Sequence, residues 1–288
     1  MKNILITGEN GYIGNALANR LTKNSEIRVM RLSLKSDEWK KYDFSHTDVI
    51  IHNAGLVHNK EAGYEQFKKV NEDLTVELAR FARQNKVKQF IFMSTMGVYS
   101  QSAEEISKFT QEKPSNNYAQ SKYNAEKKLE QFQDKDFNIS IVRPPIVYGY
   151  QAPGNYESLS RLFNKIPFFI DVENKRSMIY IDNLIEFLYL LAVKGGQGIY
   201  FPQNKEFINV ASIYQIISEK QQKPHSLINL KLFPKKLLKY NNVLNKILGD
   251  YYYLPTLPGG PKSNFINEYG EYNIVNFNDS ILRSEKIK

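Results

Sequence analysis

The chain of 288 residues contains no cysteine and only four histidines. The absence of cysteine excludes disulfides, thiolate nucleophiles and cysteine metal sites, and it fits a reducing compartment. No two histidines stand at the helical spacing of a metal-ligand pair, which argues against a metalloenzyme. The sequence also lacks an apolar run of about eighteen residues and the layout of a signal peptide. We therefore expect a cytoplasmic protein without a membrane span or a bound metal.

The charge of the chain is unbalanced toward the basic side. Its 39 Lys and Arg against 30 Asp and Glu give a net charge of +9, which favours anionic partners such as phosphorylated metabolites, nucleic acid or a lipid surface. No motif for reading nucleic acid and no aromatic platform accompanies the charge, so we expect no nucleic-acid partner. With 42% hydrophobic residues, the chain can bury a sizeable core.

The first half of the chain alternates short apolar segments with amphipathic segments, from NILIT and GNALANRLTK to ISIVRP. This alternation predicts an α/β fold with a doubly wound parallel sheet. From about residue 150 prolines interrupt shorter elements, as in a smaller region packed on the sheet. We predict a dinucleotide-binding core over 1–149, continued by about 176–195. A smaller C-terminal region then comprises 150–175 and 196–288, and its weakly periodic tail is predicted to be mobile.

Three glycines follow the first apolar segment in TGENGYIGNAL, at Gly8, Gly11 and Gly14. Glycine permits positive φ and lets the backbone approach a ligand closely, while a helix that starts there offers unpaired N–H groups to a pyrophosphate. The pattern predicts a dinucleotide site that also includes Tyr12 and Ile13. The alternative is an ordinary strand-to-helix turn.

The end of the second apolar segment discriminates between the two nicotinamide dinucleotides. An acid there would bind the ribose 2′-hydroxyl of NAD, whereas an arginine would accommodate the 2′-phosphate of NADP. The segment RVMRLSLKS places Arg31 near this point, with no acid before Asp37. The sequence therefore favours NADP(H) over NAD, although a solvated arginine is the alternative.

A tyrosine and a lysine, Tyr118 and Lys122, stand four residues apart in NNYAQSKYNAEKKLEQF. Residues at this spacing share one face of a helix. The chain contains 19 tyrosines, so the spacing alone leaves an incidental pair open. Ser94 and Thr95 end the preceding apolar segment, at the sheet edge where open α/β folds bind ligands.

Taken in order, the glycines, the hydroxyls and the Tyr-x-x-x-Lys pair resemble the short-chain dehydrogenase/reductase family over about residues 1–190. The resemblance is to the extended branch that acts on nucleotide sugars. It implies that Tyr118 is the general acid/base, and that Lys122 holds the nicotinamide ribose and lowers the tyrosine pKa. It also implies that Thr95 hydrogen-bonds the reacting oxygen, with Ser94 as the second candidate. A phenol with a pKa near 10 does need a nearby cation to exchange protons at neutral pH.

Further segments match the family in order. The resemblance implies a Rossmann core with additional cofactor contacts at Asn53, Ala54, Gly55, Asn71 and Pro144. It implies a substrate-binding role for the C-terminal region. Arg176 would contact the substrate diphosphate, Asp182 would be structural, and Asn155 and Arg161 would lie near uracil and sugar. The alternatives are ordinary turns, caps, core residues and surface ion pairs.

Two positions narrow the reaction. The family's 4,6-dehydratases carry an Asp-Glu pair directly after the catalytic threonine, where this chain has Met96 and Gly97. A UDP-sugar 4-epimerase with tightly bound NAD and a 4-ketoreductase remain. Arg31 favours reduction, and the closer resemblance is to bacterial reductases. These convert UDP-2-acetamido-2,6-dideoxy-4-hexulose to UDP-N-acetyl-fucosamine or -quinovosamine for capsule or O-antigen.

Three further interpretations concern partners. A non-catalytic NADP-binding regulator could use the same fold, but it would not need Tyr118 and Lys122. The basic stretch over 230–248 could rest on an anionic membrane, although a lid or packing helix is favoured. The resemblance implies a homodimer formed through the helices expected at 62–83 and 118–132.

Overall fold

The computed structural model describes residues 1–288 except 9, 58–60, 101–102, 223–225, 231–239 and 287–288. Its centre is a six-stranded sheet in the order β10-β6-β4-β3-β1-β2, in which every neighbouring pair is parallel. The strands are β1 (Lys2–Thr7), β2 (Ile27–Leu32), β3 (Val49–His52), β4 (Gln89–Met93), β6 (Asn138–Val142) and β10 (Gly198–Tyr200). The predicted doubly wound α/β fold is confirmed.

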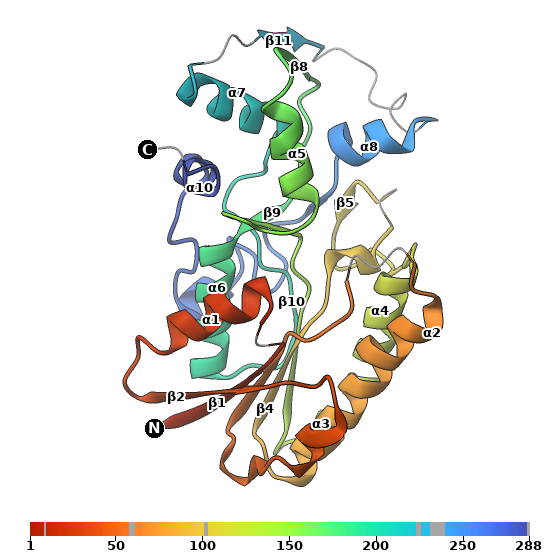
Figure 1. Cartoon of the computed structure of the whole chain (residues 1–288), viewed down its shortest axis with the longest axis vertical. Helices are drawn as coiled ribbons and strands as arrows, with labels where there is room; N and C mark the ends of the chain where they lie inside the picture. Colours follow the sequence, from red (N-terminus) through yellow and green to blue (C-terminus); the bar gives the residue numbers. More distant parts are fainter. Residues whose placement is uncertain (9, 58–60, 101–102, 223–225, 231–239, 287–288) are drawn as a thin grey trace.

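Alternate residues of the central strands pack into two separate hydrophobic cores, one on each face of the sheet. In β1, Ile4 and Ile6 pack with one apolar cluster, whereas Leu5 between them packs with the other. Helices α1 (Tyr12–Leu21) and α6 (Ile181–Lys194) cover the first face, and α3 (Leu74–Gln84) and α4 (Asn117–Glu130) cover the second (Figure 1). Because both faces are covered, β3 and β4 are buried along their whole length, as their apolar runs predict.

The order of the strands reverses between β1 and β3, because the chain first adds β2 on one side of β1 and then builds outward on the other. Ligands of open α/β sheets bind at the carboxyl ends of the strands, beside such a switch point. The turn after β1 and the turn after β3 therefore meet where a dinucleotide is expected. A short α2 (Tyr64–Phe67) and a π-helical segment, Lys68–Asp73, lead into α3.

Most of the C-terminal region lies beyond the carboxyl ends of the strands (Figure 1), whereas the segment Phe265–Tyr269 packs against α6. Its pieces are joined by three small parallel sheets, β11 with β8, β12 with β5, and β7 with β9. The strands β7 (Ile146–Tyr148) and β9 (Met178–Tyr180), like β5 (Glu105–Ile106), belong to the predicted core. The elements of the C-terminal region are α5 (Asn155–Phe163), β8 (Phe168–Asp171), α7 (Val210–Lys220), β11 (Ser226–Asn229), α8 (Asn242–Leu248), β12 (Tyr252–Tyr253), α9 (Phe265–Tyr269) and α10 (Phe277–Ser284). Near the end of the chain, the Tyr148 hydroxyl of β7 donates to Ser280 of α10 at 2.5 Å, because Ser280 itself donates to the Phe277 carbonyl, and this bond ties the tail to the body.

The structure differs from the predicted boundaries at one strand. Our division placed everything after about 195 in the C-terminal region, but Gly198–Tyr200 form β10 at the edge of the central sheet. Only three residues pair there, which is too short a run for periodicity to identify.

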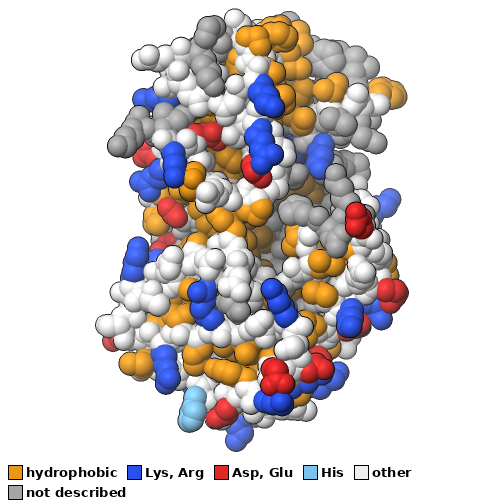
Figure 2. Space-filling view, viewed as in Figure 1, with side chains coloured by type: hydrophobic (Ala, Val, Ile, Leu, Met, Phe, Trp, Pro, Cys, Tyr) orange, Lys and Arg blue, Asp and Glu red, His pale blue; other side chains and the backbone are white. Residues whose placement is uncertain are grey.

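The helices and the distribution of charge on the surface concern the expected membrane and anionic partners. None of the described helices is long and apolar enough to cross a membrane. Figure 2 shows lysine and arginine side chains dispersed over the visible face, rather than gathered in one stripe. Of the basic stretch at 230–248, residues 231–239 lie outside the described residues, and α8 occupies its end.

Candidate active site

The turn between β1 and α1 fits closely against the turn that follows β3. Gly8 has a φ of +76°, and a Cβ atom placed on it would lie 2.7 Å from the Ala54 nitrogen and 2.9 Å from the carbonyl carbon of Asn53. The Gly11 N–H donates to the Gly8 carbonyl at 3.0 Å and precedes the first turn of α1. Only glycine fits this geometry, and it leaves backbone N–H groups open to a pyrophosphate. These residues therefore fit a dinucleotide.

The other predicted residues of this helix start are packed into the same corner. Tyr12 begins α1, and its hydroxyl would lie 2.4 Å from a Cβ atom on Gly149, at the end of β7. Ile13 packs against the apolar core and Gly14 is buried within the helix. The helix is thus fixed between the sheet and the residue that follows β7.

Arg31 lies one residue before the end of β2 and pairs with Ile6 of β1 in the sheet register. Its guanidinium is exposed and donates to the Asn15 side chain of α1. The next acid along the chain is Asp37, which forms an ion pair with Lys40 at 3.1 Å. The Arg31 guanidinium therefore lies against the first turn of α1, at Asn15.

Asn71 braces the loop after β3. It is fully buried in the π-helical segment, accepts from the Leu56 N–H at 2.7 Å, and donates to the Leu56 carbonyl at 3.0 Å and to Ser121 of α4 at 3.1 Å. A Cβ atom on Gly55 would lie 3.1 Å from the Asn71 side-chain oxygen and 3.2 Å from the Lys122 ammonium. The loop of the predicted cofactor residues is therefore held against the predicted catalytic lysine.

Lys122 is 3% exposed in the second turn of α4. Its ammonium donates to the Met93 carbonyl at 2.9 Å and lies 4.6 Å from the centroid of the Phe92 ring. Burial lowers the pKa of Lys122 to about 8, and the opposing charge of Glu126 limits the fall.

Tyr118 stands at the start of α4, where the Asn116 side chain caps the helix by accepting from the Ala119 N–H at 2.9 Å. Its ring is partly exposed, and its hydroxyl hydrogen-bonds the Thr95 side chain. Burial raises the pKa of Tyr118 to about 12, against the lowering by that hydrogen bond. The resemblance implied a lowered pKa. The structure gives the reverse, because the tyrosine is desolvated while the Lys122 ammonium is directed at the Met93 carbonyl.

The structure separates the roles of the two hydroxyl residues after β4. Ser94 is buried and donates to the Glu126 carboxylate, so its hydroxyl points away from Tyr118. Thr95 accepts from the Gly97 N–H at 3.0 Å and contacts Tyr118. Thr95 is therefore the hydroxyl that could meet a substrate oxygen, and Ser94 supports the turn.

Arg176 is 5% exposed and comes from the chain just before β9. It donates to the Gly249 carbonyl at 2.9 Å, and no carboxylate among the described residues forms an ion pair with it. Burial lowers the pKa of Arg176. The charges of Tyr251 and Asp250 oppose this lowering, so an acid does act on the buried guanidinium.

The remaining predicted residues lie elsewhere in the structure than the Tyr118–Lys122 helix. Arg161 is exposed on α5 and pairs with Glu157. Asn155 begins α5, but its side chain lies outside the described residues. The Pro144 carbonyl accepts from the Met96 N–H at 2.9 Å, which joins the end of β6 to the turn of Thr95. Asp182 opens α6 and lies 3.8 Å from Arg283, consistent with a structural role.

Comparison with known proteins extends these observations. The sequence matches the NAD dependent epimerase/dehydratase family over residues 4–201. The chain belongs to this family. Members with known names differ in activity. A UDP-glucose 4-epimerase of Vibrio cholerae is 32% identical over 214 residues, covering 65% of each chain. A UDP-2-acetamido-2,6-beta-L-arabino-hexul-4-ose reductase of Pseudomonas aeruginosa is 27% identical over 193 residues, or 63% of this chain and 47% of the relative.

Solved structures of similar fold also divide between two cofactors. The UDP-glucuronic acid 4-epimerase of Bacillus cereus, in complex with NAD, superposes with a TM-score of 0.74 at 18% identity, over 99% of this chain and 97% of that one. The RMD protein of Pseudomonas aeruginosa, complexed with NADPH, has a TM-score of 0.73 at 15% identity over 99% of both chains. At these identities the likeness establishes the Rossmann fold of this epimerase/dehydratase family member, and both cofactors occur among its neighbours.

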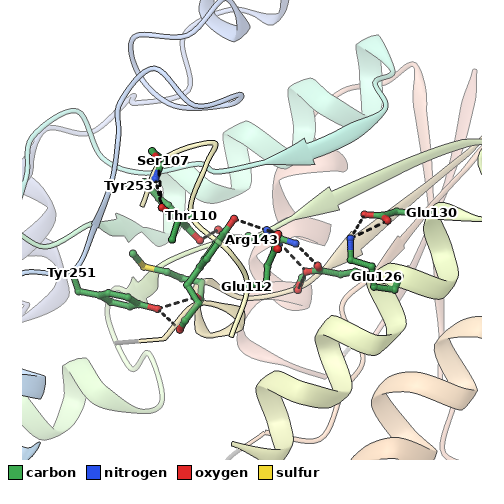
Figure 3. A network of polar contacts seen from close by, with 12 residues as sticks. Ser107, Thr110, Glu112, Glu126, Glu130, Arg143, Tyr251 and Tyr253 are labelled. Carbon is green, nitrogen blue, oxygen red and sulfur yellow. Dashed lines mark hydrogen bonds and ion pairs between the residues drawn. The ribbon is translucent and has the colours of Figure 1, made fainter. Parts of the chain in front are cut away.

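Sequence reasoning missed a buried ion-pair network behind the site (Figure 3). Its centre is Arg143, which is fully buried at the end of β6 and pairs with Glu126 and Glu112. Two signals were available. An arginine interrupts the apolar run ISIVRPPIV, and Glu126 follows Lys122 at helical spacing. A buried charge needs a partner, but the partner at residue 112 is remote in sequence and follows no periodic pattern.

Proposed function

We propose that this member of the epimerase/dehydratase family is a ketoreductase that uses NADPH. Its substrate is UDP-2-acetamido-2,6-dideoxy-4-hexulose, and its product is UDP-N-acetyl-fucosamine or -quinovosamine for surface polysaccharide. The observation that carries the proposal is that α4 presents Tyr118 and the buried Lys122 one helical turn apart, with Thr95 acting on the Tyr118 hydroxyl and Gly55 against the Lys122 ammonium. With its pKa raised to about 12, Tyr118 is protonated at neutral pH and is ready to donate to an oxygen that gains negative charge.

The proposed chemistry reduces a ketone. When bound, NADPH supplies a hydride to C4 of the sugar. Thr95 orients the C4 oxygen by a hydrogen bond, Tyr118 donates the proton that completes the hydroxyl group, and the phenolate then recovers a proton from solvent. The buried guanidinium of Arg176 holds the substrate diphosphate. Met96 and Gly97 supply neither the acid nor the base that elimination of water would need.

The cofactor preference is proposed from one side chain. Gly8, Gly11 and the start of α1 would hold the pyrophosphate, while Arg31 with Asn15 would meet the 2′-phosphate. No acid follows β2 before Asp37, so the residue type that selects NAD is missing from the end of this strand.

A UDP-sugar 4-epimerase is the second candidate, favoured by the 32% identity to the Vibrio cholerae epimerase. Such an enzyme would first oxidise the sugar, so it would need Tyr118 as a base and would retain NAD between turnovers. The raised pKa of Tyr118 opposes the base role in the cofactor-free state.

The experiment that separates the two candidates supplies purified protein with the 4-keto sugar and NADPH, with NADH in a parallel sample. Loss of one NADPH per sugar is the expected result. Absence of oxidation with either cofactor, together with interconversion of UDP-N-acetylglucosamine at its C4 centre, would establish the epimerase instead.

We also propose a homodimer formed through the helices at 62–83 and 118–132. In the structure, α3 and α4 pack side by side on one face of the sheet (Figure 1). Light scattering coupled to size exclusion should give twice the 33.5 kDa chain mass. A single chain mass at micromolar concentration would contradict the dimer.

A further inference from the structure

The network behind the active site is built around a guanidinium that has no access to solvent. The Arg143 side chain is 0% exposed and meets Glu126 through two hydrogen bonds, Nε to Oε1 at 3.1 Å and Nη2 to Oε2 at 2.6 Å. Its third nitrogen donates to Glu112 at 2.8 Å and to the Tyr99 hydroxyl at 2.6 Å. All three nitrogens of the guanidinium thereby have an acceptor, and Glu126 is fixed by a two-point contact.

Glu126 in turn holds the turn that carries Thr95. Its carboxylate accepts from the Ser94 hydroxyl, while the Ser94 N–H donates to the Val142 carbonyl at 2.8 Å. Met96, on the other side of Thr95, is held by the Pro144 carbonyl at 2.9 Å. Both neighbours of Thr95 are therefore anchored to the chain around Arg143, at residues 142 and 144 and through Glu126.

The same carboxylate lies one helical turn beyond Lys122 on α4, on the same face of the helix. Lys122 is desolvated, which favours its neutral form, and the charge of Glu126 opposes that effect. The other titratable groups near this ammonium are His52 of β3, which burial keeps neutral, and Tyr118 of α4, which is protonated. Glu126 is the group that favours the charged form of Lys122.

Arg143 is needed for Glu126 to carry this charge. Burial raises the pKa of Glu126, since an isolated carboxylate in the interior takes up a proton. Arg143 opposes this change through both charge and hydrogen bonds. All three hydrogen bonds that reach the carboxylate come from donors, two from Arg143 and one from Ser94, as an ionised group requires.

We propose that Glu126, held by Arg143, is a positioning residue that sets a carboxylate one helical turn from the Lys122 ammonium and fixes the Ser94–Thr95 turn. Two tyrosines of the C-terminal region complete the arrangement (Figure 3). Tyr251 donates to the Met96 and Tyr99 carbonyls at 2.9 and 3.0 Å, and Tyr253 donates to the Arg143 carbonyl at 3.1 Å. The consequence for cofactor binding rests on the proposed function, whereas the titration of Lys122 does not.

The test compares Glu126→Gln with Glu112→Gln in the full chain. Both variants remove a carboxylate paired with Arg143, but only Glu126 acts on Lys122. Carbon-13 labelled lysine reports the titration by NMR, with the Lys122 signal assigned by its loss in Lys122→Arg. The Lys122 midpoint near pH 8 should persist in Glu112→Gln. It should fall by roughly one pH unit in Glu126→Gln.

A midpoint unchanged in Glu126→Gln, or shifted equally in both variants, would overturn the proposal. Should Glu126→Gln fail to fold, the double variant Arg143→Met with Glu126→Met replaces the pair by apolar side chains, which buried ion pairs often tolerate. It should show the same lowered midpoint. NADPH affinity of the wild-type protein, measured over the same pH series, tests the proposed cofactor site separately.

Discussion

Burial shifts the two side chains of the Tyr-x-x-x-Lys pair in opposite directions. It raises the pKa of Tyr118 to about 12 and lowers the pKa of Lys122 to about 8, because a desolvated site favours the neutral form of each group. Tyr118 is thus an acid throughout the physiological range. The pKa of Lys122 is close to physiological pH, so a small rise in pH removes its charge.

Removal of the phenol hydroxyl should abolish proton donation without disturbing the cofactor site. Tyr118→Phe should lower kcat for NADPH-dependent reduction by roughly 10²- to 10⁴-fold, the usual contribution of a general acid. The Kd for NADPH, measured by fluorescence, should stay unchanged. Tyr123→Phe on the same helix is the matched control and should retain wild-type kcat. Substantial turnover by Tyr118→Phe would show that another group supplies the proton.

The lysine predicts a pH dependence of cofactor binding. Because its folded pKa is about 8, the ammonium is present below that pH and is lost as the pH rises through it. NADPH affinity of the free protein should therefore weaken above pH 8. Lys122→Arg should remove the weakening, since an arginine stays charged. If the NADPH affinity of the wild-type protein did not change from pH 7 to 9.5, this result would contradict a role for the ammonium in binding.

A second buried residue, His52 of β3, joins strand β1 to helix α3. The Thr75 hydroxyl donates to the Asn71 carbonyl at 2.8 Å, so it accepts from His52 Nε2 at 2.9 Å. The opposite nitrogen, Nδ1, then accepts from the Thr7 hydroxyl at 2.7 Å. This tautomer is neutral, and burial lowers the pKa of His52 to about 3.

Because His52 is neutral in the folded protein, the free energy of unfolding should fall as the pH becomes acidic. Its folded pKa lies below the unfolded value of 6.5, so its contribution is complete above pH 6.5 and is lost as the pH falls toward 3. Between pH 7 and 5 the free energy of unfolding should fall by about 2 kcal/mol more in the wild-type protein than in His52→Gln. Urea unfolding at several pH values measures this difference. If both proteins lost the same free energy of unfolding, His52 would have to be charged in the folded wild-type protein.

At the scale of elements, the contact between the β1–α1 turn and the β3 loop determines the cofactor site. Gly8 and Gly195 both have positive φ, +76° and +78°, but only Gly8 has atoms within reach of an added Cβ. Gly195→Ala should cost about 1 kcal/mol of stability and leave NADPH affinity intact. Gly8→Ala should weaken NADPH binding by roughly tenfold or more, because the turn must move away from Ala54. Similar affinities of the two variants would contradict a cofactor site at this turn.

The elements also show where sequence reasoning succeeds. The parallel sheet followed from apolar runs that repeat along the chain. Strand β10 and the Arg143 network did not follow, because a three-residue strand has no measurable period and Glu112 lies 31 residues from its partner. The raised pKa of Tyr118 depends on burial, which a motif does not specify.

At the scale of the whole molecule, the two regions meet at the proposed substrate. The backbones of Arg176 and Tyr251 form an isolated β-bridge. The Tyr251 hydroxyl in turn donates to the carbonyl of Met96, the residue after Thr95. Arg176→Met should raise KM for the UDP-sugar by roughly 10- to 100-fold, the loss of a hydrogen bond to a charged group, with NADPH affinity unchanged. Arg83→Met, at an exposed arginine of α3, is the control. An unchanged KM for the Arg176 variant would move the diphosphate site elsewhere.

The direct test of the reductase follows the hydride itself. NADPH deuterated at the transferable position would be given to the protein with UDP-2-acetamido-2,6-dideoxy-4-hexulose, and the sugar product analysed by NMR. The ketoreductase account predicts one deuterium at C4 of the product for each NADPH consumed. A product without deuterium at C4, or no consumption of the cofactor, would contradict it.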